Sequence, residues 1–104
     1  MARRSRMERY RDILRVVANF GPIRQTHIMY KANLTWEGLK EDLSRLKGTQ
    51  LVAETIREEG VFYMVTQAGR DVLAHFGRIE ETLQIQVAPS IVSPYSSLDN
   101  QSLF

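Results

Sequence analysis

The segment at residues 21–47, GPIRQTHIMYKANLTWEGLKEDLSRLK, constrains the fold more than any other part of this chain. It predicts two short helices, the first opening at residue 25 or 26 and the second spanning residues 36–47. Between them, Asn33 tolerates the left-handed backbone conformation that a tight turn often requires, and Thr35 is a favourable N-cap for the second helix. Two short helices joined by a tight polar turn have the layout of a helix-turn-helix motif.

A longer helix is expected before this segment. Ser5 is a suitable N-cap for a helix that runs to about Phe20, where Gly21-Pro22 stops it. The apolar residues of this helix recur at helical spacing, and they are Met7, Tyr10, Ile13, Leu14 and Val17. The spacing predicts one buried face and one solvent-facing side.

Two β-rich runs and a last helix are expected after the motif. Gly48 is the expected C-cap of the second motif helix, and the runs at 51–56 and 61–65 are the expected strands, with Arg57-Glu58-Glu59-Gly60 between them as the wing. Thr66 caps the last helix, which Gly77 is expected to interrupt. Three helices, a β-hairpin and a C-terminal helix predict an α+β winged helix-turn-helix fold, for which duplex DNA is the expected partner.

The length of 104 residues suits one small hydrophobic core. We expect one winged helix-turn-helix domain with its C-terminal helix at residues 1–83. The segment 84–104 differs in composition, since it holds five serines, two of the three prolines and a single charge, Asp99. Low charge without glycine repeats indicates a tail that can dock on a surface, more than a flexible linker.

The formal net charge of +2 hides an uneven distribution. Residues 1–47 hold eleven Lys and Arg against five acids, whereas residues 48–104 hold three against seven, so the front half is about +6 and the back half about −4. The chain has no cysteine, and its two histidines lie far apart, so we expect no metal or other cofactor. Neither a signal peptide nor a membrane span is evident, which favours a cytoplasmic, nucleoid-associated protein.

Three stretches of the chain carry a resemblance to a known family: RRSRMERYRDIL, GPIRQTHIMYKANLTWEGLKEDLSRL and FYMVTQAGRDVL. Together they cover residues 3–83 and resemble the archaeal winged helix-turn-helix proteins, which include predicted transcription regulators and small dimeric nucleoid proteins. Of these pieces, IMYKANLTW is much more specific than a generic helix-turn-helix. The resemblance implies a winged-helix fold, DNA binding without enzymatic activity, and frequent dimerisation through the last helix.

A helical wheel of residues 36–47 places Leu39, Leu43 and Leu46 inward and a polar set outward. Two of the outward residues, Glu37 and Glu41, match phosphates poorly, although a glutamate can accept a hydrogen bond from cytosine N4. A basic and polar cluster around the start of this helix favours DNA binding. The residues we expect at the DNA interface are Arg24, Lys31, Asn33, Thr35, Trp36, Glu37, Lys40, Glu41, Ser44, Arg45 and Arg57, with an N-terminal arm of Arg3, Arg4 and Arg6.

Plainer interpretations stand beside these. A short basic N-terminus is more often a solvated chain end than a DNA-seeking arm. Trp36 is next to the leucine face, which favours partly buried packing over a contact with sugar or phosphate. Tyr10, Tyr30 and Tyr63 are expected in the core or at its rim rather than as a stacking platform. No catalytic set, glycine-rich phosphate loop or small-molecule site is evident, so we do not expect an enzyme.

The last helix carries the assembly hypothesis. Its apolar stripe recurs at steps of four, three and four and consists of Val72, Phe76, Ile79 and Leu83. Because its first half suffices to cover the core, the surplus predicts a homodimer, formed by pairing of the last helices or by exchange of tails. The alternative is a monomer with a docked tail. The sequence thus predicts a sequence-specific, dimeric transcription regulator; the alternatives are a winged-helix module for protein partners and an architectural nucleoid protein.

Overall fold

The computed structural model describes residues 4–84. Its first helix, α1 (Arg6–Phe20), begins at the expected cap, because the Ser5 hydroxyl accepts from the Glu8 amide at 3.1 Å and the Glu8 carboxylate accepts from the Ser5 amide at 2.7 Å. This reciprocal pair is a capping box, which satisfies two amides that the helix leaves unpaired. The helix ends at Gly21, whose amide donates to the Val17 carbonyl at 2.9 Å.

The helix-turn-helix motif is confirmed. Helix α2 (Gln25–Ala32) is capped by Asn33, which adopts the left-handed conformation with φ of 57°. Helix α3 (Trp36–Gly48) begins at Thr35, whose hydroxyl accepts from the Gly38 amide at 3.1 Å. The end of α3 differs from the prediction, since Gly48 is its last residue and not its cap.

The C-cap of α3 is Thr49. Its hydroxyl can bond to carbonyls at the helix end, whereas the expected cap, a glycine, has no side chain to do so. The Thr49 hydroxyl lies 3.1 Å from both the Arg45 and the Leu46 carbonyl oxygens and shares its single proton between them, and the Thr49 amide donates to the Arg45 carbonyl at 3.0 Å. These bonds satisfy carbonyls that lack partners at a helix end. The left-handed residue follows one position later, at Gln50, where φ is 65°.

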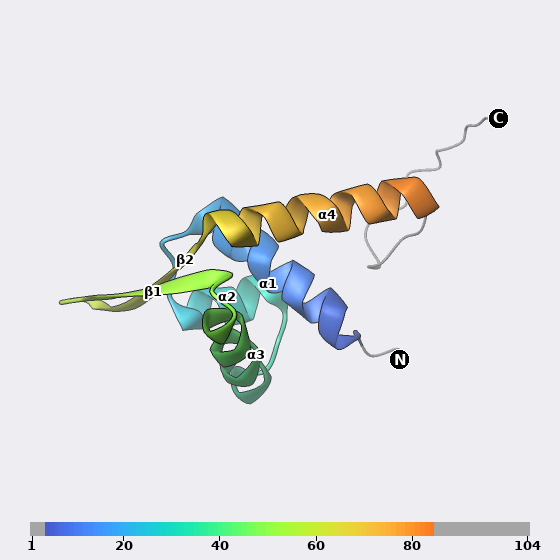
Figure 1. Ribbon diagram of the computed structural model, residues 1–104. Coiled ribbons are helices and arrows are strands. Elements are labelled where there is room, and N and C mark those ends of the chain that lie inside the picture. The colour runs from blue at the N-terminus through green and yellow to red at the C-terminus, as the bar shows by residue number, and fades with distance from the viewer. Residues whose placement is uncertain (1–3, 85–104) are drawn as a thin grey trace.

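A two-stranded antiparallel hairpin forms the wing. Strands β1 (Val52–Arg57) and β2 (Gly60–Val65) pair from Val52 with Val65 to Arg57 with Gly60. The turn between them therefore contains only residues 58 and 59, and the whole hairpin, rather than residues 57–60, projects from the body of the protein (Figure 1).

The last helix, α4 (Gln67–Leu83), begins at the expected cap, where the Thr66 hydroxyl accepts from the Gly69 amide at 3.0 Å. It continues without a break through Gly77, so the expected interruption is wrong. A single glycine lowers helix stability by only about 1 kcal/mol, which the contacts of the neighbouring residues with the core offset.

Helix α1 lies between α4 on one side and the pair α2 and α3 on the other (Figure 1). The core beneath these elements is apolar and consists of Ile13, Leu14, Val16, Val17, Ile23, Ile28, Ala32, Leu39, Leu43, Leu46, Val52 and Tyr63. Met7, expected in the apolar stripe of the first helix, is exposed instead, because it lies in the first turn of α1, ahead of the residues of this helix that are buried in the core.

Two charged residues, Arg11 and Asp42, are also buried, and each is only 1% exposed. Asp42 accepts from the Arg9 guanidinium at 2.8 and 3.3 Å, which joins α3 to α1. The pKa of Arg9 is raised, chiefly by this hydrogen bond. Burial lowers the pKa of Arg11, but hydrogen bonds to Asp12 and Glu80 outweigh the burial and raise it overall, so the buried guanidinium stays charged.

Candidate nucleic-acid interface

Helix α3 presents a polar face to solvent because its three leucines hold the opposite face in the core. Leu39, Leu43 and Leu46 are at most 3% exposed. The outward orientation expected from the helical wheel is confirmed, since Glu37, Glu41, Ser44 and Arg45 are all exposed. An open hollow of about 530 Å³ runs along this face and is lined by Trp36, Glu37, Gly38, Lys40, Glu41 and Ser44.

The charges on this face are mixed. Glu41 lies 3.9 Å from the Arg45 guanidinium, which is the same distance from buried Asp42. The pair between Glu41 and Arg45 is long and exposed, so it stabilises little and leaves both side chains free to rearrange. Lys40 is exposed and has no ion-pair partner among residues 4–84, so its ammonium is available to an external anion.

The turn before α3 combines a tight backbone with a cation. Asn33 serves the backbone through its left-handed conformation, and the Thr35 side chain caps α3, so both have structural roles at the start of α3. The Lys31 ammonium lies 4.1 Å from the centre of the Phe20 ring, a cation–π arrangement at the protein surface. This contact holds Lys31 in place without neutralising it.

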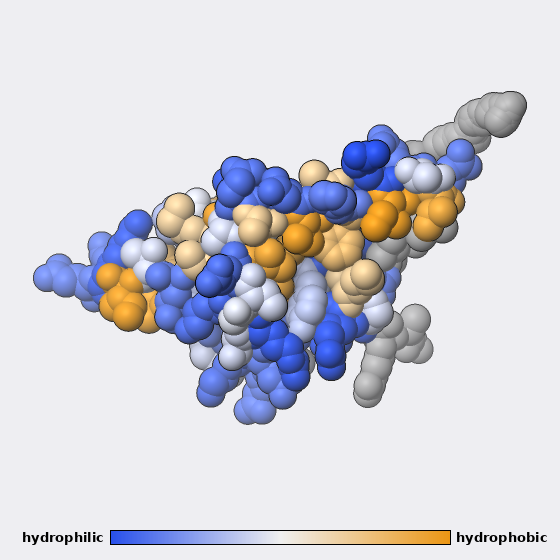
Figure 2. Space-filling model, in the orientation of Figure 1, coloured by the Kyte–Doolittle hydropathy of each residue, from blue (hydrophilic) through white to orange (hydrophobic). Residues whose placement is uncertain are grey.

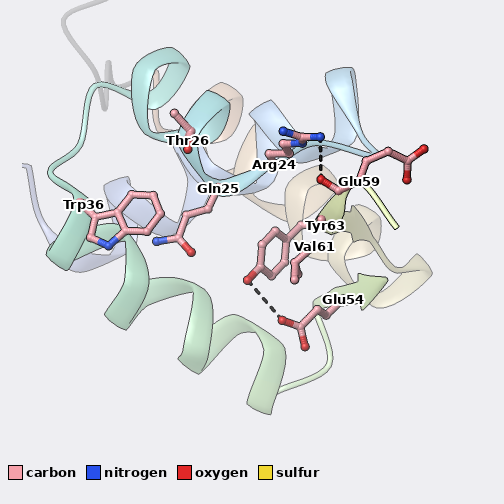
Figure 3. A pocket seen from close by; sticks show the side chains of 9 residues that line it. Arg24, Gln25, Thr26, Trp36, Glu54, Glu59, Val61 and Tyr63 are labelled. Atoms are coloured by element: carbon pink, nitrogen blue, oxygen red, sulfur yellow. Dashed lines mark hydrogen bonds between the residues drawn. The ribbon is translucent and has the colours of Figure 1, made fainter. Parts of the chain in front are cut away.

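Arg24 braces the wing against α2. Its guanidinium donates to the Glu59 carbonyl at 2.8 Å (Figure 3). The same guanidinium lies 5.2 Å from the centre of the Phe62 ring. Arg57 lies over the same ring at 5.1 Å. The two expected DNA contacts are thus brought together by one aromatic side chain, at the junction of the motif and the wing.

A cleft of about 290 Å³ separates the wing from the motif. Its lining comes from α2, α3 and the hairpin, and consists of Arg24, Gln25, Thr26, Trp36, Glu54, Glu59, Gly60, Val61 and Tyr63 (Figure 3). The Tyr63 hydroxyl donates to the Glu54 carboxylate at 3.4 Å, and the same carboxylate pairs with the Lys47 ammonium at 3.1 Å.

Burial, followed by the negative charge of Glu54, raises the pKa of the Tyr63 hydroxyl, so this group remains a protonated donor at neutral pH. Polar contacts from Tyr63 through Glu54 to Lys47 thus join the hairpin to α3 at the wing-side wall of the cleft. The amide Nε2 of Gln25 is buried and has no hydrogen-bond partner among the described residues.

The tip of the wing is acidic and partly apolar. Glu58 and Glu59 form the turn and are exposed, and Ile56 beside them is 77% exposed. This composition is less favourable to phosphates than a basic wing, and only Arg57 supplies a cation there.

The N-terminal arginines do not form one free arm. Arg3 lies outside the described residues, and Arg6 is exposed. Arg4 bonds to Asp12 at 2.7 Å and to the Ala32 carbonyl at 2.8 Å, so its guanidinium is engaged inside the fold. The sequence suggested a DNA contact for Arg4 because a hydrogen bond to a carbonyl 28 residues away cannot be recognised from the neighbouring residues.

The apolar stripe of α4 divides into two parts. Val72 and Phe76 pack against the core, whereas Ile79 is 49% and Leu83 60% exposed. Apolar side chains accordingly remain visible toward the C-terminal end of α4 (Figure 2). This surplus is the one expected from the sequence, and it marks α4 as a candidate contact surface.

Sequence reasoning missed two features of the motif. Tyr30, expected in the core or at its rim, is 72% exposed on α2, because Ile28 and Ala32 supply the buried face of this short helix. Asp42, left unassigned, is buried by its pairing with Arg9. At 100° per residue, Asp42 lies about 60° from Leu39 and about 40° from Leu46, at the edge of the leucine face, and this was the available signal.

Within residues 4–84, no three His, Asp or Glu side chains come close enough together to hold a metal ion. Of the helices described in this range, none has the length and apolar character that a membrane crossing requires.

Comparison with known proteins places the chain in a family. The family model for the winged helix-turn-helix matches residues 3–84. The chain belongs to the winged helix-turn-helix family. No curated protein matches it.

Solved structures share the winged helix at low sequence identity. A Listeria innocua protein of unknown function is 16% identical with a TM-score of 0.66, over 82% of this chain and 60% of that one. Streptococcus pneumoniae FabT, solved in complex with DNA, is 11% identical with a TM-score of 0.62, over 81% of this chain and 61% of that one.

A MarR family protein of Mycobacterium tuberculosis, solved in complex with p-aminosalicylic acid, is 15% identical with a TM-score of 0.61, over 83% of this chain and 67% of that one. At these identities the likeness concerns the fold. The winged-helix chain spans about three fifths of the length of the first structures that it matches.

Proposed function

We propose that this chain binds duplex DNA as a homodimer and acts as a sequence-specific transcription regulator. The observation that carries the proposal is α3, a helix anchored by buried leucines whose exposed face of Trp36, Glu37, Lys40, Glu41 and Ser44 projects beside a wing. This is the arrangement in which a winged helix places its recognition helix in the major groove.

Further support comes from the related fold of FabT, whose structure was determined in complex with DNA. The excess of cations in residues 1–47, which include α2 and α3, supplies a long-range attraction to phosphates. The exposed end of α4 supplies a surface through which two copies can hold two recognition helices one helical turn of DNA apart.

The decisive experiment is a titration with a random-sequence duplex at several salt concentrations. We expect affinity to fall steeply as salt rises, because bound phosphates release their counterions. Competition between a selected sequence and random DNA then separates a regulator from an architectural nucleoid protein, which would show no preference. Absence of salt-dependent binding would contradict both the regulator and the architectural nucleoid protein.

Lys40→Ala is expected to weaken binding to all duplex sequences and to lower the slope of log affinity against log salt by roughly one unit. The reason is the loss of one phosphate contact from an exposed, unpaired ammonium. Arg78→Ala is the matched control, since it removes the same charge from an exposed position on α4. Equal slopes for Lys40→Ala and wild type would remove Lys40 from the interface. Lys31→Ala should act similarly, although it also uncovers Phe20.

Glu41→Ala is expected to leave the fold intact, because the side chain is exposed and its pair with Arg45 is long. Removing an anion from the groove-facing surface should raise non-specific affinity or change the preferred sequence. Selection of bound sequences from a random pool, with affinities measured in parallel, checks both effects. If neither quantity changes in a protein that binds DNA, α3 is not the groove reader.

A second candidate function is a winged-helix module for a protein partner. It is favoured by the acidic residues of α3 and of the wing tip, Glu37, Glu41, Glu58 and Glu59, all of which are exposed. A basic partner would match this surface better than phosphates do. Failure of the DNA titration at low salt would make this the leading function.

A further inference from the structure

Arg4 lies outside the helix-turn-helix motif but binds the backbone of its turn, and we call this contact the clamp. The Arg4 guanidinium donates to the carbonyls of Ala32 and Asn33, the two residues at which α2 ends and the turn begins. The same guanidinium donates to the Asp12 carboxylate of α1 at 2.7 Å. Arg4 therefore connects the backbone just before α3 to a single carboxylate on α1.

The Asp12 carboxylate also begins a series of hydrogen bonds that leads to α4. The second oxygen of Asp12 accepts from Arg11 at 2.7 and 3.1 Å. The remaining nitrogen of Arg11 donates to the Glu80 carboxylate at 2.9 Å. The Arg15 guanidinium, which is on α1 like that of Arg11, lies 3.5 Å from the Glu80 carboxylate. An unbroken series of charge-assisted hydrogen bonds thus crosses α1, from the motif turn to α4.

The middle of this series has little freedom to rearrange. Arg11 is 1% exposed, so its charge depends on Asp12 and Glu80 for compensation, and water cannot replace either carboxylate without opening the protein. Asp12 in turn divides its two oxygens between Arg4 and Arg11. A displacement of Glu80 with α4 therefore moves Arg11, then Asp12, and then the clamp on the turn.

We propose that Glu80, Arg11, Asp12 and Arg4 form a relay that couples the position of α4 to the turn preceding α3. The inference rests on the proposed function in one respect: if α4 joins two copies, the relay sets how the recognition helices are held relative to that joint. The four residues are then positioning residues for DNA binding, although none lies on the α3 face.

The alternative is that each pair stabilises only its immediate surroundings. The two possibilities differ in how far from Glu80 a substitution at this residue changes the structure. A relay transmits it to Asn33 through Asp12, whereas independent pairs confine it to α4 and the adjoining side of α1.

The first experiment measures backbone amide chemical shifts in the full chain without DNA. Glu80→Ala is expected to shift the amides of Asn33 and Leu34, whereas Glu81→Ala, the same change at the next and exposed position of α4, should leave them unchanged. In an Asp12→Asn background, Glu80→Ala should produce no additional shift at these amides. Unchanged amides in Glu80→Ala, or a shift that persists in the Asp12→Asn background, would overturn the relay.

Milder substitutions keep the experiment decisive where a variant does not fold. Glu80→Gln can replace Glu80→Ala, since it retains the shape of the side chain and removes the charge. Arg4→Gln can replace Asp12→Asn, because Arg4 lies at the partly exposed end of the series. Glu80→Gln is expected to shift the amides of Asn33 and Leu34, and to produce no additional shift at these amides in an Arg4→Gln background.

The second experiment measures affinity for a random-sequence duplex of 30 base pairs. Glu80→Ala is expected to weaken binding by about fivefold or more, and Glu81→Ala to weaken it not at all, although both remove one negative charge. An equal effect in the two variants would overturn the positioning role. If the wild type does not bind DNA, the proposed function fails, and the amide shifts still decide whether the relay exists.

Discussion

A Leu83→Glu variant is expected to sediment as a folded monomer and to lose roughly 100-fold or more in affinity for DNA that carries two half-sites. Leu83 and Ile79 are 60% and 49% exposed in the single chain, so burying the part of each side chain that is still exposed gains about 1–2 kcal/mol. A partner copy that covers them would bring two introduced carboxylates together near the symmetry axis. Without the dimer, two half-sites about 10 base pairs apart can no longer be held at once.

Sedimentation and DNA titration of the same samples test this expectation. Thr82→Glu is the matched control, because it adds the same charge at the adjacent exposed residue of α4, about 100° around the helix. The control should remain dimeric. A wild-type protein that is already monomeric at tens of micromolar would refute the dimer and require another explanation for the exposed end of α4.

Gly69→Ala is expected to destabilise the protein by about 1–3 kcal/mol, through overpacking. A Cβ at Gly69 would lie 2.3 Å from the Leu51 carbonyl oxygen and 2.6 Å from Val65 Cγ2. The carbonyl belongs to the backbone, so it cannot move away as the end of a flexible side chain does. Either α4 or the start of the hairpin must shift.

Gly77→Ala in the same helix is the control for Gly69→Ala. A Cβ there meets nothing within 4 Å, so the substitution should stabilise the protein by about 0.5–1 kcal/mol through helix propensity alone. Thermal unfolding followed by circular dichroism measures both variants. A Gly69→Ala protein as stable as the wild type would show that α4 is not packed against Leu51 as closely as described.

The caps and turns were predictable because their chemistry is local. Ser5, Thr35 and Thr66 each accept from an amide three residues later, and Asn33 takes the left-handed conformation that its side chain tolerates. The outward face of α3 followed from the leucine spacing alone. The same local reasoning failed at Gly77, because the packing of Phe76 before it and the hydrogen bond between Arg11 and Glu80 after it offset the low helix propensity of one glycine.

By itself, the sequence determined the order of helices and strands, the helix-turn-helix motif, and the polar character of α3, since these depend on residues within one or two turns of each other. Only the tertiary structure decided which charges remain free. Arg4 clamps a turn 28 residues away, Arg11 reaches Glu80 across 69 residues, and Arg24 braces the wing. An arginine can pair with any acid or carbonyl within reach, so its partner depends on which elements pack together, and hydrophobic burial decides that packing.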